Sequence, residues 1–128
     1  MRALLATHTL LWWLSDDLAL SKPARKFLAE TRNTAIVSAA SAWEIATKVR
    51  LGKLPTAADL AADFVGYLER EGFELLDISA EHAIRAGLLP GAHKGPFDRM
   101  LIAQAQAEGV PVVSNEVVFD AYSVRRIW

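Results

Sequence analysis

Three acidic side chains lie next to the buried segments that the sequence predicts to be strands. Glu44 stands one turn into the helix after the second such segment, Asp98 lies in the first turn of the helix before the fourth, and Glu116 follows the fourth. In an open parallel sheet, ligands bind beyond the carboxyl ends of the strands, so these three carboxylates could meet at one edge. A fold that gathers carboxylates raises their pKa values and usually binds a divalent cation there.

The types of these side chains restrict which metal they could bind. A set of oxygen ligands, in a chain without cysteine, suits Mg²⁺ or Mn²⁺ rather than zinc. Such ions activate water and stabilise the charge on a phosphodiester during hydrolysis. A purely structural alternative is open at this point: Asp98 and Glu44 would favour the dipoles of their helices, and Glu116 would belong to a turn.

Short apolar segments separated by amphipathic helices predict the elements that must position these acids. The segments expected to be strands are residues 2–5, 34–37, 73–76, 110–113 and 124–127. This alternation predicts an α/β fold, with a central parallel sheet of about four or five strands flanked by helices on both faces. We see no internal repeat, low-complexity tract or linker, so we expect a single domain over residues 1–128.

Residues with capping side chains indicate where the helices begin. The predicted caps are Thr7, Thr9, Ser21 and Ser79. Pro96 predicts the start of another helix, which is expected to end at Gly109. One further helix is expected from Thr56 to about Arg70, because its apolar residues recur on one face.

The composition excludes several classes of protein. With 128 residues, of which 52% are hydrophobic and 23% charged, the chain can bury a core without disulfides. The absence of cysteine excludes thiol catalysis and cysteine-ligated zinc, and it fits a cytoplasmic location. The longest apolar run near the start is too short to cross a bilayer, so no membrane partner is expected. A formal net charge of −1 means that nucleic acid must be bound through local basic residues or a metal.

Four motifs contain the acidic residues and their neighbours. They are Leu4-Leu5-Ala6-Thr7-His8-Thr9-Leu10-Leu11-Trp12, Ser41-Ala42-Trp43-Glu44-Ile45, Pro96-Phe97-Asp98-Arg99-Met100-Leu101-Ile102-Ala103, and Ser114-Asn115-Glu116 running on to Phe119-Asp120-Ala121-Tyr122. In this order and spacing they resemble the PIN-domain family, specifically its VapC-like ribonuclease toxins of type II toxin–antitoxin systems. The resemblance covers essentially the whole chain.

This resemblance implies a metal-dependent endoribonuclease that hydrolyses RNA phosphodiester bonds. It implies four acidic positions, namely the end of the first strand, where this chain has Ala6, followed by Glu44, Asp98 and Glu116. Residue 6, Asp98 and Glu116 would hold Mg²⁺ or Mn²⁺, while Glu44 would position water or a second ion. The resemblance also implies a cognate antitoxin protein, an RNA substrate, and a homodimer that assembles further with the antitoxin.

The chain departs from the family pattern at three positions. Ala6 replaces the first acid, Gly95 replaces an acid often found just before Pro96, and Glu116 stands where aspartate is common. Ala6 is the serious departure, because a methyl group cannot ligate Mg²⁺, which demands oxygen atoms at roughly 2.0–2.1 Å. We therefore expect this chain to be inactive or weakened as a nuclease.

Other residues near the acids have supporting roles in the resemblance. Thr7, Ser114 and Asn115 are expected to order the ligands and the metal-bound water. Arg99 and Lys48 are candidates for contact with RNA, and the alternative for each is an ordinary surface ion pair. A local basic rim is expected from Lys48, Arg50, Lys53, His93 and Lys94.

The adjacent Trp12 and Trp13 must point to different sides of their helix. One is expected in the core, and the other, with a neighbouring leucine, is expected to contribute to a surface for a second subunit or for the antitoxin. Phe64 and Tyr67 would continue that surface.

Two other functions compete with the ribonuclease prediction. One is a non-catalytic PIN-like module that still binds an antitoxin or RNA. The other is a Mg²⁺-dependent phosphotransfer domain, which would need a nucleophilic aspartate after the first strand and a partnered lysine. The first of these requirements is not met, since Ala6 occupies that position.

Overall fold

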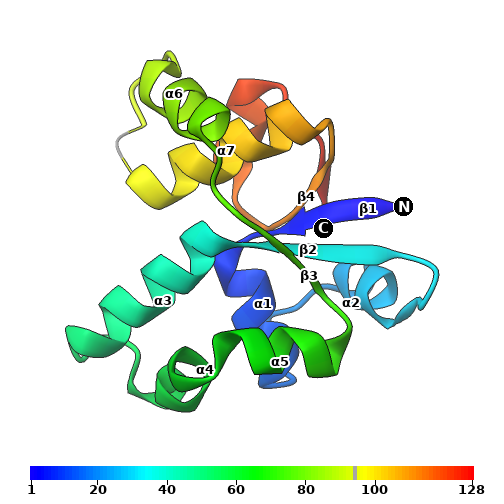
Figure 1. Ribbon diagram of the computed structural model, residues 1–128. Coiled ribbons are helices and arrows are strands. Elements are labelled where there is room, and N and C mark those ends of the chain that lie inside the picture. The colour runs from blue at the N-terminus through cyan, green and yellow to red at the C-terminus, as the bar shows by residue number, and fades with distance from the viewer. Residues whose placement is uncertain (94) are drawn as a thin grey trace.

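Five parallel strands form one sheet in the computed structural model, which describes residues 1–93 and 95–128. Across the sheet their order is β3-β2-β1-β4-β5 (Figure 1). The strands are β1 (Arg2–Leu5), β2 (Thr34–Ser38), β3 (Glu74–Leu76), β4 (Val112–Val113) and β5 (Arg126–Ile127). The predicted α/β fold with a parallel sheet is confirmed. The last two strands are shorter than the apolar segments that predicted them.

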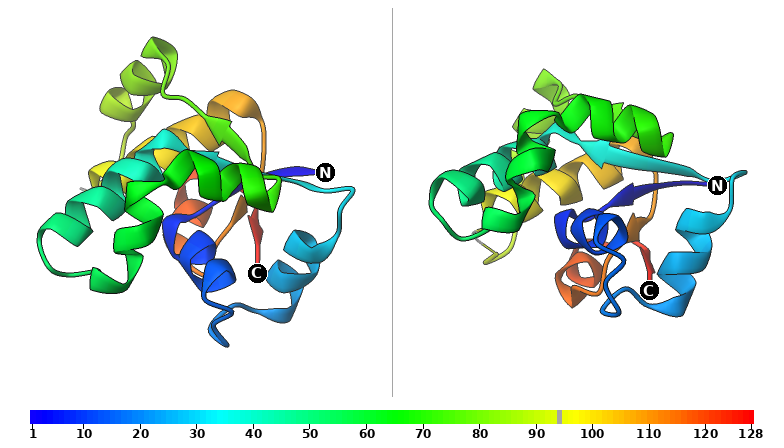
Figure 2. Two further views of the ribbon diagram at one scale, coloured as in Figure 1. Left: turned by 60° about the horizontal axis from the view of Figure 1, so that its bottom comes forward. Right: turned by 90° about the horizontal axis from the view of Figure 1, so that it is seen from below.

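Helices cover both faces of this sheet (Figures 1 and 2). One face carries α6, α7 and η2, and the other carries α1, α2, α4 and α5, whereas α3 contributes to the core on both sides. Their bounds are α1 Thr7–Leu14, α2 Lys22–Ala29, α3 Ala39–Arg50, η1 Pro55–Ala57, α4 Ala58–Ala62, α5 Phe64–Glu71, α6 Ala80–Leu88, α7 Pro96–Glu108 and η2 Val117–Tyr122.

The central strand β1 supplies side chains to both halves of the core. Ala3 and Leu5 belong to the apolar cluster formed with α1, α2 and α5, while Leu4 belongs to the cluster formed with α7 and η2. All three side chains are fully buried, as expected for a strand covered on both faces whose side chains alternate in direction. Among the described residues, no helix is long and apolar enough to cross a membrane.

The prediction of a single helix from Thr56 to about Arg70 is wrong, because the segment is divided into η1, α4 and α5. The break is at Asp63, whose backbone has φ −141° and ψ 54°, well outside the helical region. Aspartate is a poor residue for a helix interior. Its carboxylate folds over Gly66, where any Cβ would collide with it.

Two of the predicted caps are confirmed, and two are wrong. The hydroxyl of Ser21 accepts a hydrogen bond from the N–H of Ala24, and the hydroxyl of Ser79 accepts one from the N–H of His82. Neither threonine caps α1, since its N-cap residue is Ala6, which offers no side-chain hydrogen bond.

Candidate active site

Residue 6 lies where the central strand ends. The side chain of Ala6 is buried, with 3% of its surface exposed, and its N–H donates to the carbonyl of the last residue of β4 at 3.2 Å. Ala6 belongs to the same apolar cluster as Ala40, one turn before Glu44, and Leu101, one turn after Asp98. Position 6 is therefore enclosed between the segments that carry the acids.

The threonines that follow position 6 fasten the start of α1 to its surroundings. The hydroxyl of Thr7 lies 2.9 Å from that of Ser41 in α3, and the hydroxyl of Thr9 donates to the carbonyl of Val113 at 2.6 Å. Thr7, Thr9 and Ser41 are all buried. These hydroxyls hold α1 against α3 and β4, which is why they are not available as helix caps.

Glu44 lies on the second turn of α3 and is buried, with 7% of the residue exposed. Its Oε2 atom accepts a hydrogen bond from Nζ of Lys48, one turn later, at 2.5 Å. The ammonium group of Lys48 is also close enough to lower the pKa values of His8 and Glu116. Lys48, a predicted contact for RNA, therefore lies at the edge of the acidic cluster, by which we mean Glu44, Asp98 and Glu116.

Asp98 lies in the first turn of α7 and is half-buried. Burial raises its pKa, and the charge of Glu116 raises the pKa further, while a hydrogen bond with His93 at 3.0 Å opposes both effects. The charge of Glu44 also raises this pKa. His93 fits here because Gly95 has no side chain: a Cβ at that residue would lie 3.0 Å from Nε2 of His93 and 3.6 Å from Oδ2 of Asp98.

Glu116 follows β4 and is presented by a tight turn. Its N–H donates to the buried hydroxyl of Ser114 at 3.0 Å, whereas Asn115 is exposed. The Oε1 atom of Glu116 lies 3.4 Å from Nδ1 of His8 on α1. This contact is the largest cause that lowers the pKa of Glu116 and raises the pKa of His8, with burial opposing in both cases.

These electrostatic effects place Glu44, Asp98 and Glu116 in one neighbourhood, since the charges of both glutamates reach Asp98. Each acid also contacts a basic partner of its own. Among residues 1–93 and 95–128, however, no three His, Asp or Glu side chains are arranged to hold a metal ion. Ala6 offers only a methyl group at the end of the central strand, so that position supplies no donor atom for a metal ion.

Sequence reasoning did not identify the two histidines as partners of the acids. His8 and His93 come from α1 and from the loop before α7, and only the folded chain brings them to Glu116 and Asp98. A sequence signal was not available, because a single histidine beside a predicted helix is usually a packed or solvated residue.

Arg99, a predicted contact for RNA, is hydrogen-bonded to the protein's own backbone. Its guanidinium donates to the carbonyls of His93 at 2.9 Å, Ala86 at 3.1 Å and Leu89. It therefore holds the loop between α6 and α7, which carries the partner of Asp98. Lys94, the last member of the expected basic rim, lies outside the described residues.

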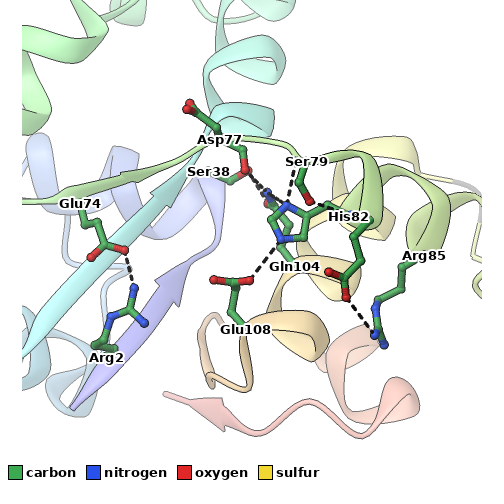
Figure 3. Close-up of polar contacts among 10 residues, drawn as sticks. Arg2, Ser38, Glu74, Asp77, Ser79, His82, Arg85, Gln104 and Glu108 are labelled. Atoms are coloured by element: carbon green, nitrogen blue, oxygen red, sulfur yellow. Dashed lines mark hydrogen bonds and ion pairs between the residues drawn. The ribbon is translucent and has the colours of Figure 1, made fainter.

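A second polar network lies beside the end of β2, on the side of α6 and α7 (Figure 3). The hydroxyl of Ser38 donates to Oε1 of Gln104 at 2.5 Å, and Nε2 of Gln104 lies 3.3 Å from Nδ1 of His82. Nδ1 of His82 accepts the N–H of Ser79, so its proton is on Nε2, which donates to Glu108 at 3.3 Å. Because Ser38 also caps α3, this network holds the helix that carries Glu44.

An apolar groove of about 420 Å³ adjoins the acidic cluster through His8. It runs between α1 and the segment from η1 to α5, and it includes one of the two tryptophans singled out from the sequence. Its lining residues are His8, Leu11, Trp12, Leu14, Ser15, Asp17, Leu54, Thr56, Ala57, Asp59, Leu60 and Tyr67.

Comparison with known proteins shows which family shares this arrangement. The chain matches the PIN domain over residues 3–124. It belongs to the PIN-domain family. A relative among characterised proteins is Ribonuclease VapC16 from Mycobacterium tuberculosis, which is 40% identical over 58 residues. That stretch covers 45% of this PIN-domain chain and 41% of VapC16.

Solved structures of similar fold come from toxin–antitoxin complexes. A chain of VapBC2 from Rickettsia felis, bound to a DNA fragment from its promoter, superposes with a TM-score of 0.71 and 22% identity, covering 98% of this chain and 97% of that one. A chain of FitAcB from Neisseria gonorrhoeae gives a TM-score of 0.70 and 16% identity, covering 100% and 97%. At these identities the likeness establishes that this chain has the PIN-domain fold.

Proposed function

We propose that this PIN-domain protein is the toxin of a toxin–antitoxin pair, an endoribonuclease that hydrolyses RNA phosphodiester bonds in the cytoplasm. The observation that carries the proposal is that Glu44, Asp98 and Glu116 share one neighbourhood, where burial and then the charges of Glu116 and Glu44 raise the pKa of Asp98. Carboxylates that repel one another at the carboxyl edge of a parallel sheet reduce the stability of the fold. A site that binds a cation explains why a protein would keep them there.

The proposed site is incomplete in this chain. Asp98 and Glu116 are the acids that would hold Mg²⁺ or Mn²⁺, together with an acid at residue 6, and Glu44 would position water beside them. When bound, such an ion lowers the pKa of water and offsets charge on the phosphate. With Ala6 in place the ligand set is one carboxylate short, so we assign no metal-dependent step to the chain as it stands and propose that its nuclease activity is impaired.

The chain's own residues have three other roles in this proposal. The paired hydroxyls of Thr7 and Ser41 fix the start of α1 beside α3, and so orient the end of the central strand. Ser114 fixes the turn that presents Glu116. Lys48, at the edge of the cluster, would contact a phosphate of the RNA, for which its partial exposure leaves room.

We further propose that the cognate antitoxin occupies the apolar groove beside His8. An apolar groove on the surface of a small protein usually marks a binding site for a partner. The solved relatives VapBC2 and FitAcB are complexes, which supports a protein partner for this fold. We also propose a homodimer that assembles further with the antitoxin, as the resemblance to VapC-like toxins implies.

The experiment that tests the nuclease is RNA cleavage by this protein and by its Ala6→Asp variant, each with Mg²⁺, Mn²⁺ or EDTA. Cleavage by the variant alone, and only with metal, is expected. The Ala6→Asn variant is the matched control, because it adds nearly the same volume without a charge. Adding Asp98→Asn to Ala6→Asp should abolish the restored cleavage and exclude a contaminating nuclease.

The second candidate is a non-catalytic module that binds an antitoxin or RNA. It is favoured by the basic partner that each of the three acids has within the protein. No cleavage by Ala6→Asp with either metal, on RNA that the protein binds, would support this candidate over the nuclease.

A further inference from the structure

An aromatic pair, of which Trp43 is exposed and Phe97 partly buried, lies beside the acidic cluster. Trp43 on α3 and Phe97 on α7 pack edge to face, with ring centroids 4.7 Å apart and planes at 75°. Each immediately precedes an acid of the cluster in sequence, Glu44 and Asp98 respectively. The contact between α3 and α7 therefore brings two aromatic rings and two carboxylates to one place.

Trp43 and Glu44, although adjacent in sequence, face different environments. Residues next to each other on a helix project about 100° apart, so Glu44 is directed inward while Trp43 is directed to solvent. Glu44 is 7% exposed and Trp43 is 57% exposed. The two rings meet edge to face rather than stacked, and more than half of the surface of Trp43 is exposed.

A nucleobase is a flat group of a size that suits stacking on an exposed indole. Stacking of unpaired bases on aromatic side chains is the usual way in which proteins bind single-stranded RNA. Lys48 lies on the same helix, at the edge of the acidic cluster, and supplies positive charge for the strand's phosphates. Phe97 holds the indole in place from α7.

We propose that Trp43, supported by Phe97, is a stacking platform for one unpaired base of single-stranded RNA, next to the bond to be cut. This inference rests on the proposed function and adds to it the residue on which an unpaired base would stack; a base in a duplex is not free to stack on a protein side chain. Stacking uses the flat face of a base and not its hydrogen-bonding edge, so the platform would accept any unpaired base. Purines, which have the larger rings, would bind best.

The test is a binding measurement, for which the chain with Ala6 is suitable because its cleavage is impaired. A fluorescein-labelled adenosine decamer RNA is titrated with the protein in EDTA, and its anisotropy is followed. Trp43→Ala is expected to weaken binding about 5- to 150-fold, which corresponds to the roughly 1–3 kcal/mol of one stacked base. Trp43→Phe should recover part of the loss. Leu88→Ala, at an exposed apolar residue of α6, is the matched control and should change binding less than twofold.

A decamer of the ribose–phosphate backbone without bases separates stacking from electrostatics. If Trp43 stacks on a base, Trp43→Ala should leave the affinity for this abasic strand unchanged, while Lys48→Ala should weaken both strands alike. A blunt duplex of the same length should bind more weakly than the single strand and should be insensitive to Trp43→Ala.

Three results would overturn the platform: equal affinity of the unsubstituted and Trp43→Ala proteins for the adenosine decamer, no binding of that decamer at all, or a change from dimer to monomer in Trp43→Ala by light scattering. The last result would assign the indole to an interface between copies of this chain. Cleavage by Ala6→Asp is measured separately, so the ribonuclease proposal can stand where the platform fails, and the platform can stand where cleavage fails.

Discussion

The hydroxyl groups of Thr7 and Ser41 lie 2.9 Å apart, and they join the first turn of α1 to the first turn of α3. Thr7 follows residue 6 directly, and Ser41 precedes Glu44 by three positions. The direction of the chain at residue 6 is therefore set by a contact that does not involve the side chain at that residue. A carboxylate introduced there should meet a cluster that is already in place.

The Ala6→Asp variant should be less stable than the unsubstituted protein when no metal is present. Position 6 is 3% exposed, so the new carboxylate is buried beside groups of like charge, and we expect a loss of about 1–3 kcal/mol. Added Mn²⁺ should then stabilise the variant more than the unsubstituted protein, because a ligand that binds only the folded state shifts unfolding by mass action. Thermal melting in EDTA and in Mn²⁺ measures both effects.

Ala6→Asn separates charge from size in this experiment. The amide adds almost the same volume as the carboxylate but no charge, so it should show a smaller loss without metal and little gain from Mn²⁺. Equal melting temperatures and equal metal shifts for Ala6→Asp and the unsubstituted protein would contradict a shared site.

The Asp98→Asn variant should be more stable than the unsubstituted protein at neutral pH without metal. Burial and the charge of Glu116 raise the pKa of Asp98 above its ordinary value of 3.8, so its ionised form is disfavoured in the folded state. Below pH 3.8 the carboxyl is protonated in both folded and unfolded chains and costs nothing. As pH rises through the raised pKa, the unfolded chain ionises first and stability is lost.

Urea denaturation between pH 3 and pH 7 tests this assignment. The difference in the free energy of unfolding between Asp98→Asn and the unsubstituted protein should be near zero at pH 3 and grow in favour of the variant toward pH 7. The asparagine Oδ1 can still accept a hydrogen bond from His93, which limits other effects of the substitution. A difference that is constant with pH would contradict burial and the charge of Glu116 as the causes of the raised pKa.

Gln104→Leu should destabilise the protein by about 1–3 kcal/mol, because it removes a buried partner from Ser38 and from the carbonyl of Asp77 (Figure 3). Gln104 has no exposed surface. Gln106→Leu, on the same helix, loses one hydrogen bond to Tyr122 at a partly exposed position and should cost less. The free energy of unfolding of both variants is measured by urea denaturation. Equal losses of stability would contradict burial as the reason for the larger effect of Gln104→Leu.

Arg99→Lys should also destabilise the protein, by roughly 1–3 kcal/mol. A lysine ammonium cannot reproduce the planar set of N–H donors with which the guanidinium binds three backbone carbonyls. Arg50→Lys, at an exposed position that ends α3, is the control and should change stability by less than about 0.5 kcal/mol. The midpoint of urea unfolding is the measurement. A similar midpoint for both variants would mean that the contacts of Arg99 contribute little.

Much of the fold could be predicted because buried parallel strands and capped helices leave local signals. β1 coincides with the apolar run at residues 2–5, and Ser21 and Ser79 cap helices as expected. Thr7 and Thr9 carried the same local signal as these serines, but their hydroxyls are bound by Ser41 and Val113, which are distant in sequence. Tertiary contacts therefore decide whether a hydroxyl side chain before a helix caps that helix or binds another segment.

The candidate site could be predicted only as a set of acids. Which basic group contacts each acid depends on loops and helices that meet in the folded chain, as with His93, which reaches Asp98 because Gly95 leaves the space. Gln104 gave no signal, because glutamine is ordinarily a surface residue and its network becomes visible only in three dimensions.

The parallel order of the sheet also governs when the acidic cluster can form during synthesis. β1 pairs with β4 through Leu4 with Val112 and Leu5 with Val113, partners that are far apart in the chain. A ribosome must therefore release residue 113 and those just after it before Glu116 can approach Asp98, although β1 and β2 can pair much earlier. The nascent chain consequently passes most of its synthesis without an assembled acidic cluster.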